Sequence, residues 1–101
     1  FSQQNNVNIG KYSVNLNSRV ISYNKEKLSL TEKEIKIISF LNSSIKPVTI
    51  EELQTEVWGH KSKLETHTVE THVYRLRKKV EKKFKDTSFI ISKKNGYKIE
   101  I

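Results

Sequence analysis

The 101-residue chain contains no cysteine, one proline and three glycines. Without cysteine it has neither disulfide bonds nor thiolate metal sites, a composition that fits a reducing compartment. Three scattered glycines do not form a glycine-rich phosphate-binding loop. No apolar run approaches the length of a membrane span, and nothing resembles a signal peptide. We therefore expect a small cytoplasmic domain with no membrane partner.

The sequence also has few groups suited to catalysis or metal binding. His60, His67 and His72 lack the i, i+4 spacing of a helical metal pair and have no cysteine partners. No nucleophile lies beside an evident base. We expect no enzymatic activity, no metal and no cofactor.

Basic residues are concentrated in the second half of the chain. Residues 1–59 carry seven Lys and Arg against six Glu, whereas residues 60–101 carry twelve against five Asp and Glu. The net charge of +8 therefore belongs mostly to the second half. Such asymmetry favours a polyanionic partner, because a cation placed on a phosphate releases condensed counterions. Charge alone does not choose among DNA, RNA and an acidic membrane, and a merely solvated lysine surface stays an alternative.

The N-terminal third has the pattern of short strands. Residues 1–6 are polar and unpatterned, which indicates a linker remnant before a domain spanning residues 7–101. From Val7 to Leu30, apolar residues alternate with polar ones in short runs. The runs are separated by turn residues, namely Gly10, Asn17-Ser18 and Asn24-Lys25. This pattern predicts up to four short antiparallel strands in a sheet with one solvated face.

Two helices with matching start signals follow. Thr31 with Glu34 and Thr49 with Glu52 form capping boxes, and each is flanked by a hydrophobic staple, Leu30 with Ile35 and Val48 with Leu53. The first helix is expected to bury a broad apolar side before Lys46-Pro47 ends it, comprising Ile35, Ile37, Ile38, Phe40, Leu41 and Ile45. The second, shorter helix is expected to bury Ile50, Leu53 and Val57 and to end at Trp58-Gly59.

A third, basic helix is predicted over residues 66–84. Its apolar residues fall on one stripe at helical spacing, namely Val69, Val73, Leu76, Val80 and Phe84. The opposite side carries His67, Thr71, Tyr74, Arg75, Lys78 and Lys82, with Thr68 at its edge. Such side chains can reach phosphates and base edges, and the major groove of DNA admits a helix.

The C-terminal residues predict a hairpin with a basic tip. The β-rich runs Phe89–Ser92 and Tyr97–Ile101 flank Lys93-Lys94-Asn95-Gly96, and Asn-Gly is a strong hairpin signal. Three helices followed by a basic hairpin is the order of a winged helix-turn-helix, in which the third helix enters the major groove and the hairpin reaches the backbone or minor groove.

From about Ile9 to the C-terminus, the sequence resembles the DNA-binding effector domain of OmpR/PhoB-type two-component response regulators. The resemblance lies in four motifs: Leu30-Thr31-x-x-Glu34, Leu53-x-x-x-Val57-Trp58-Gly59, Thr68-Val69-Glu70-x-His72-Val73-x-x-Leu76-Arg77-x-Lys79, and Gly96-Tyr97. It implies an α+β fold with an N-terminal four-stranded antiparallel sheet, a three-helix bundle and a C-terminal hairpin wing. It further implies transcriptional regulation, with an upstream receiver domain and a sensor kinase in the full-length protein.

The resemblance also implies roles for individual residues. The residues that it implies contact DNA bases are Thr68, Thr71 and Arg75. Glu70 and Arg77 are further candidates, although the helical periodicity puts Arg77 nearer the core stripe. Arg75 is the leading reader, because a guanidinium bonds a guanine edge bidentately. The residues that it implies contact the phosphate backbone of DNA are Trp58, His67, His72, Tyr74, Lys78, Ser92 and Tyr97. Trp58 is also expected to be partly core.

Two segments are candidate binding sites that also fit a purely structural role. Lys93 and Lys94 are candidate wing contacts, but they also fit a solvated tip, since the wing is one residue and one glycine shorter than is usual in the family. The connector residues His60, Lys61, Ser62, Lys63 and Leu64 form a candidate RNA polymerase contact or a plain linker. Tyr74 stands where the family commonly has arginine, which removes one cation.

These patterns predict sequence-specific binding of duplex DNA by the effector domain of a transcriptional response regulator. Copies are expected side by side on repeated half-sites, with the isolated domain monomeric away from DNA. The alternative is a basic winged-helix module for protein or RNA interaction, whose binding would survive the loss of Arg75 and Thr71.

Overall fold

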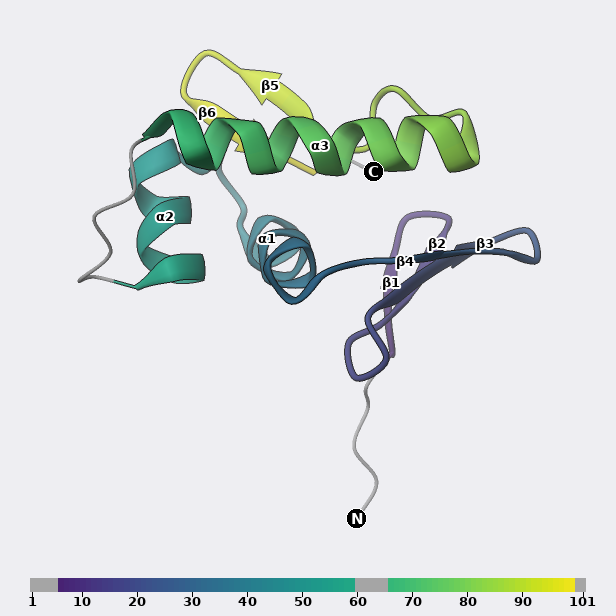
Figure 1. The fold of residues 1–101 in the computed structure, drawn as a ribbon. Coiled ribbons are helices and arrows are strands. Elements are labelled where there is room, and N and C mark those ends of the chain that lie inside the picture. The colour runs from purple at the N-terminus through teal and green to yellow at the C-terminus, as the bar shows by residue number, and fades with distance from the viewer. Residues whose placement is uncertain (1–5, 60–65, 100–101) are drawn as a thin grey trace.

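In a computed structural model of the protein, residues 6–59 and 66–99 are described, and their architecture is that of a winged helix with an N-terminal sheet (Figure 1). The elements in chain order are β1 Asn6–Ile9, β2 Tyr12–Asn15, β3 Val20–Tyr23, β4 Glu26–Ser29, α1 Glu32–Ser43, α2 Ile50–Trp58, α3 Thr66–Phe84, β5 Ile91–Lys93 and β6 Gly96–Lys98. This order confirms the predicted fold class. No helix in the described ranges is long and apolar enough to cross a membrane.

The N-terminal sheet is a meander of four antiparallel strands in the order β1-β2-β3-β4. Its buried face carries Tyr12 and Val14, whereas Ser13 between them is exposed, as an alternating strand pattern requires. Val14 pairs with Ile21 on the next strand, and both are fully buried. The predicted sheet with one solvated face is thus confirmed. β1 begins at Asn6, one residue before the predicted start of the domain.

Both capping boxes are formed. The Thr31 hydroxyl accepts from the Glu34 N–H at 3.2 Å, and the Glu34 carboxylate accepts from the Thr31 N–H at 2.8 Å. Thr49 and Glu52 make the same reciprocal pair at the start of α2, at 3.1 and 3.0 Å. Two otherwise unpaired backbone donors are satisfied at each helix start, which fixes where α1 and α2 begin.

The end of α1 differs from the prediction at Ile45. The helix ends at Ser43, and Ser44 adopts an extended conformation with φ −92° and ψ 134°. Ile45 is therefore no longer on the helical wheel, and it is 89% exposed rather than buried. Its carbonyl accepts a hydrogen bond from Lys98 Nζ of β6 at 2.8 Å. The prediction that Ile45 belongs to the core was wrong, because the helix ends at Ser43 and the extended Ser44 takes Ile45 off its buried face.

α3 crosses the other helices and ends beside the sheet. Figure 1 shows its N-terminal half beside α2, its middle above α1 and its C-terminal end near the four strands. Its predicted apolar stripe is buried along its whole length, namely Val69, Val73, Leu76, Val80 and Phe84. Removing these side chains from water supplies the main attraction between α3 and the rest of the domain. The opposite face of α3 is consequently directed outward.

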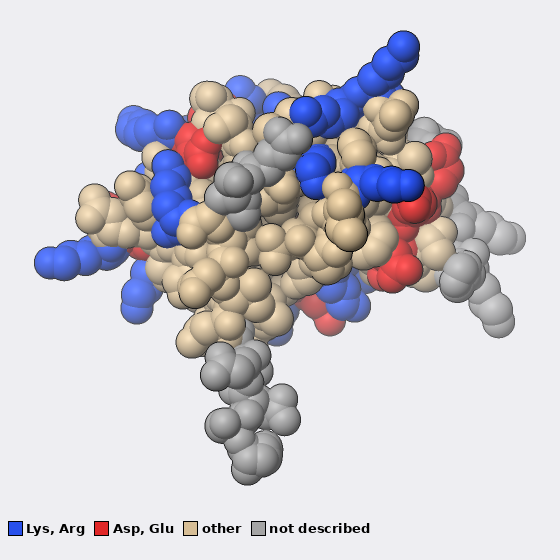
Figure 2. All heavy atoms as spheres, turned by 180° about the vertical axis from the view of Figure 1, so that it is seen from behind, with Lys and Arg blue, Asp and Glu red and all other residues tan. Residues whose placement is uncertain are grey.

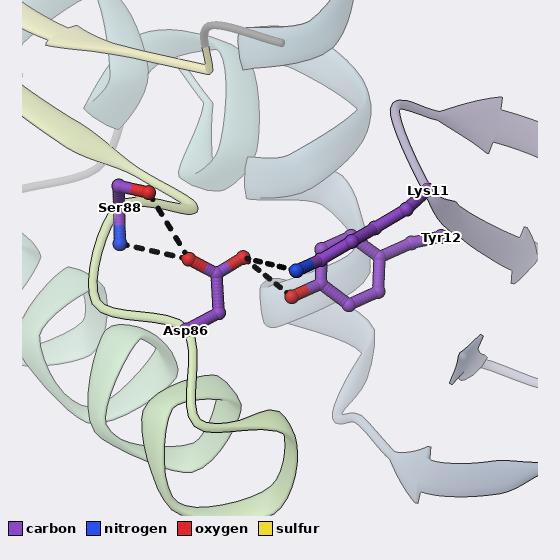
Figure 3. A network of polar contacts seen from close by, with 4 residues as sticks. All are labelled: Lys11, Tyr12, Asp86 and Ser88. Atoms are coloured by element: carbon purple, nitrogen blue, oxygen red, sulfur yellow. Dashed lines mark hydrogen bonds and ion pairs between the residues drawn. The ribbon is translucent and has the colours of Figure 1, made fainter. Parts of the chain in front are cut away.

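A polar network ties the start of the sheet to the segment after α3 (Figure 3). The Tyr12 hydroxyl donates to Asp86 Oδ2 at 2.5 Å, and Lys11 Nζ lies 4.0 Å from the same oxygen. Ser88 donates to Asp86 Oδ1 from its backbone N–H at 2.9 Å and from its hydroxyl at 3.1 Å. The carboxylate thus joins two segments that are 74 residues apart.

These contacts shift the pKa values of both groups. Burial alone raises the pKa of Asp86, but hydrogen bonds from Tyr12 and Ser88 and the charge of Lys11 lower it by more, so that the net shift is downward. Burial, followed by the hydrogen bond to Asp86 and its charge, raises the pKa of Tyr12 well above its ordinary range. Asp86 is therefore held as an anion and Tyr12 as a neutral donor.

Acid unfolding provides a test of this network. Because the folded-state pKa of Asp86 is lowered, its stabilising contribution is complete above the unfolded pKa of about 4 and is lost as pH falls through the folded value. Asp86→Asn is expected to reduce the free energy of unfolding at neutral pH and to flatten its acid dependence below about pH 4. Urea titrations across that range measure both effects. Glu56→Gln, at an exposed carboxylate of α2, is the control, and an unchanged acid slope in Asp86→Asn contradicts the assignment.

Candidate nucleic-acid interface

The outward face of α3 forms a straight stripe of polar and cationic side chains. Its members, defined here as the α3 stripe, are Thr68, Thr71, Arg75, Lys78 and Lys82, which recur every three or four residues opposite the buried stripe. Arg75 and Lys78 are exposed. Arg75 forms no hydrogen bond or ion pair with any residue in the described ranges. Its guanidinium donors are therefore available to an external ligand.

Thr71 is more restricted than its place on the α3 stripe suggests. Its hydroxyl donates to the backbone carbonyl of His67 at 2.9 Å, one helical turn earlier. That bond uses the only hydroxyl proton, so the side chain offers a methyl group and an acceptor lone pair. A methyl group suits apolar contact with the thymine methyl. Thr68, which is half-buried, has no such bond to a described residue.

One flank of α3 anchors the helix to the rest of the domain. Its three polar side chains each meet a different element: His72 meets Trp58 of α2, Lys79 meets Glu34 of α1 and Lys83 meets Glu26 of β4. The Lys79–Glu34 distance is 2.7 Å, and the Glu34 side chain is only 7% exposed. The same Glu34 oxygen also accepts from the Thr31 N–H. Two of the cations in α3 are thus used for positioning.

Trp58 is half-buried, as predicted for a partly core residue. Its ring meets that of His72 edge-on, with centroids 5.0 Å apart and planes at 69°. Lys33 Nζ lies 5.8 Å from the Trp58 ring and donates to the Val57 carbonyl at 3.3 Å. These contacts hold the end of α2 against α3, and they orient Trp58 and His72 relative to the α3 stripe.

The other flank of α3 faces the hairpin. Burial raises the pKa of Tyr97 of β6, the charge of Glu70 raises it further, and the charge of Arg77 opposes the shift. Both charges act on Tyr97, and Figure 1 shows the hairpin beside the N-terminal half of α3. Arg77 is half-buried, in agreement with the helical periodicity that put it near the core stripe. Glu70 and Arg77 therefore lie beside the α3 stripe, where the wing approaches.

The hairpin turn carries the two candidate wing residues. Lys93 pairs with Gly96, so that Lys94 and Asn95 form the two-residue turn, and Lys93 and Lys94 are both exposed. Ser92 is also exposed, whereas Tyr97 is half-buried. β5 begins at Ile91, later than the predicted run from Phe89, because Ile91 already pairs with Lys98, the last residue of β6. Phe89 and Ile90 before it are buried in the core. The basic hairpin tip is confirmed as an exposed feature.

The hairpin is joined to the segment between α1 and α2. Val48 and Tyr97 form an isolated antiparallel bridge, with two backbone hydrogen bonds of 2.8 Å. Gly96 adopts φ +139°, and a Cβ there would lie 2.0 Å from the Val48 carbonyl oxygen. Glycine is required at this point for both backbone conformation and close approach. The wing therefore has a defined position relative to the start of α2.

The remaining candidates divide into exposed residues and residues outside the described ranges. His67 and Tyr74 are exposed, and Lys78 Nζ lies 5.6 Å from the centre of the Tyr74 ring. The candidate polymerase loop, His60 to Leu64, lies outside the described residues. Among the described residues, no three His, Asp or Glu side chains are grouped to hold a metal ion.

The surface charge is unevenly distributed. Figure 2 shows basic side chains projecting from several parts of the far side and acidic ones gathered at the edge where α2 lies. The exposed carboxylates of α2 are Glu51, Glu52 and Glu56. Because cations occur in several parts of the surface, the position of each one on α3 decides whether it is available to a polyanion that lies along this helix.

Comparison with known proteins identifies the family. The model described as "Transcriptional regulatory protein, C terminal" matches residues 25–99. The chain belongs to this family. Among its relatives, the probable transcriptional regulator ycf27 of Galdieria sulphuraria is 30% identical over 101 residues, covering 96% of this chain and 40% of the relative. The DNA-binding response regulator MtrA of Mycobacterium tuberculosis is 30% identical over 94 residues, covering 91% of this chain and 41% of its own length.

Solved structures agree with this assignment. The DNA-binding domain of E. coli CadC superposes with a TM-score of 0.84 at 28% identity, covering 99% of this chain and 95% of that one. The DNA-binding domain of the response regulator AdeR, solved in complex with an intercistronic region, gives a TM-score of 0.79 at 28% identity, covering 93% of this chain and 98% of that one. The chain spans about two fifths of the length of the relatives it matches.

Proposed function

We propose that this domain binds duplex DNA sequence-specifically, with α3 in the major groove and the hairpin of β5 and β6 at the backbone or minor groove. The observation that carries the proposal is the α3 stripe, in which Arg75 is exposed and has no partner among the described residues. The AdeR domain bound to an intercistronic region supports the same mode of action. An outward guanidinium on a rigid helix suits a guanine edge.

The proposed base readers are Arg75, Thr71 and Thr68. Glu70 and Arg77 are candidates of second rank, because they lie on the flank of α3 toward the wing. The proposed backbone contacts fix the register of the domain without reading sequence, and comprise Trp58, His67, His72, Tyr74, Lys78, Ser92 and Tyr97. Lys93 and Lys94 at the hairpin tip are the proposed wing contacts.

Selection from a pool of randomised duplex DNA, repeated at two salt concentrations, tests the proposal. Enrichment of a half-site, especially one repeated in tandem, supports sequence-specific binding and identifies the base pairs to examine. Affinity that falls with salt without any enriched sequence refutes it, because such binding is electrostatic only. A parallel selection from single-stranded and hairpin RNA tests the alternative of an RNA-binding module.

Arg75→Ala is expected to cost about 1–3 kcal/mol on the selected site and to relax specificity at one base position. Arg75→Lys is expected to recover charge but not specificity, because an ammonium does not bond a guanine edge bidentately. Fluorescence anisotropy with each of the four bases at that position measures both effects.

Lys78→Ala is the matched comparison on the same stripe. It is expected to weaken all sequences alike and to lower the salt slope by about one unit, as loss of one phosphate contact does. Equal loss on specific and random duplexes for Arg75→Ala would show that Arg75 is another phosphate contact and not a base reader.

For the full-length protein, we propose a cytoplasmic response regulator with an upstream receiver domain that a sensor kinase phosphorylates. The relative MtrA is a DNA-binding response regulator, and the chain spans 41% of that protein. Residues 60–64 are the proposed contact with RNA polymerase. Tandem half-sites from the selection would support side-by-side binding of copies that are monomeric away from DNA.

A further inference from the structure

The cationic face of α3 continues beyond the residues assigned to DNA reading. Lys82 follows Lys78 by one turn, and Lys85 comes directly after the helix end at Phe84. Both are exposed, and together with Lys78 they border a hollow of about 610 Å³ whose other walls are Glu81 and Thr87. The hollow thus presents three ammonium groups and one hydroxyl against one carboxylate.

That carboxylate already has a partner. Glu81 Oε1 lies 3.6 Å from Lys78 Nζ, whereas Lys82 and Lys85 form no ion pair with any residue in the described ranges. Lys79 and Lys83, on the adjacent flank, are both paired with carboxylates of other elements. Lys79 and Lys83 are therefore neutralised by other elements, whereas no described carboxylate pairs with Lys82 or Lys85. Two unpaired ammonium groups suit an oxyanion with several acceptors, such as a phosphate.

The position of the hollow along α3 indicates which phosphate it meets. Lys82 lies seven residues after Arg75, or about 10 Å along the helix. The major groove is about 12 Å wide, so a helix whose Arg75 reaches base edges brings Lys82 to the groove rim. We infer that Lys82, Lys85 and Thr87 form a second contact that binds backbone phosphates flanking the base-read half-site. This inference rests on the proposed function and adds sequence-independent affinity to it.

A purely structural role for these lysines has a different signature. Cations near the end of a helix interact favourably with its unpaired carbonyls. Lys85 also has φ +61°, at a position after the helix where glycine is common. A structural role would change the unfolding temperature and would leave the salt dependence of DNA binding untouched. Phosphate binding would change the salt dependence of DNA binding and leave the unfolding temperature unaltered.

The test compares the wild type with Lys82→Ala/Lys85→Ala on two duplexes, one trimmed to the selected half-site and one extended by about one helical turn of roughly 10 bp at each side. The plot of log K against log salt is expected to become less steep by about two units for the variant on the extended duplex. On the trimmed duplex the two proteins are expected to bind alike. Lys36→Ala, which removes an exposed lysine from α1, is the charge control and is expected to preserve the slope.

Equal slopes for variant and wild type on the extended duplex would overturn the inference, as would a loss that persists on the trimmed duplex. A lowered unfolding temperature with an unchanged slope would assign the lysines to helix stability. Failure of the proposed function is separate: a wild type that enriches no sequence refutes specific reading, whereas the difference in salt slope between wild type and variant on a random duplex still reports phosphate contact by Lys82 and Lys85.

Discussion

Gly96→Ala is expected to destabilise the domain by about 3 kcal/mol or more, through backbone strain combined with overpacking. The added Cβ would lie 2.0 Å from the Val48 carbonyl oxygen and 2.5 Å from its carbon. These are backbone atoms, which cannot rotate away as a flexible side chain can. The hairpin must therefore move, and the two hydrogen bonds between Val48 and Tyr97 are lost. Chemical denaturation measures the loss of stability.

Gly59→Ala is a matched control for this substitution. Gly59 also has a positive φ, at +102°, but a Cβ there meets no atom within 4 Å. Its cost is expected to be limited to backbone strain, about 1–2 kcal/mol. The difference between the two variants isolates the close approach of the wing to Val48. Equal destabilisation by both would show that the contact between the hairpin and Val48 contributes nothing.

Gly96→Ala is also expected to weaken DNA binding under conditions where the domain stays folded, because the wing lysines lose their position. Lys93 and Lys94 sit at the tip of a hairpin that the Val48 bridge orients. Binding measured well below the unfolding temperature detects this change. Retained affinity and salt slope would indicate that the hairpin tip makes no DNA contact.

Lys79→Met is expected to cost about 3 kcal/mol of stability, at the lower end of the range for breaking a buried ion pair. The substitution leaves the Glu34 carboxylate, 7% exposed, without its cation. Lys79 itself is 38% exposed, which moderates the effect because part of its charge is already hydrated. Methionine preserves the apolar stem of the side chain. Urea denaturation measures the cost.

A double-mutant cycle separates the ion pair from general packing. Glu34→Gln retains an oxygen that can accept from the Thr31 N–H, and combining it with Lys79→Met is expected to cost less than the sum of the single variants. Lys83→Met, which breaks an exposed pair at 3.3 Å, is the control and is expected to cost about 0.5 kcal/mol. Additive costs for Glu34 and Lys79 would contradict their coupling.

The features that were predictable from the sequence are local or periodic. Each capping box joins residues three apart, so that its two hydrogen bonds depend on neighbouring residues alone. The buried stripe of α3 and the alternation in β2 follow from the fixed repeat of each element. Ile45 shows where this reasoning fails, because a helical repeat applies only within the helix. The helix ends at Ser43, two residues before Ile45, and Ser44 is already extended.

Contacts between polar side chains that are far apart in the sequence could not be predicted from local patterns or from periodicity. Asp86 and Tyr12 are 74 residues apart, and Lys79 and Glu34 are 45 apart. The motif that contains Lys79 could not show that its side chain pairs with Glu34 at the start of α1. Glu70 and Arg77, candidate base readers by resemblance, act through their charges on Tyr97 of the hairpin, which is distant in sequence.

The sequence by itself determined the elements, their order and the outward face of α3, because capping, alternation and helical repeat act between residues close along the chain. Tertiary structure alone decided which cations of that helix are available to a ligand. A lysine that meets a carboxylate from another element is held in place, and a lysine that meets none stays exposed to an external phosphate. Lys79 and Lys82, three residues apart on one helix, differ for this reason.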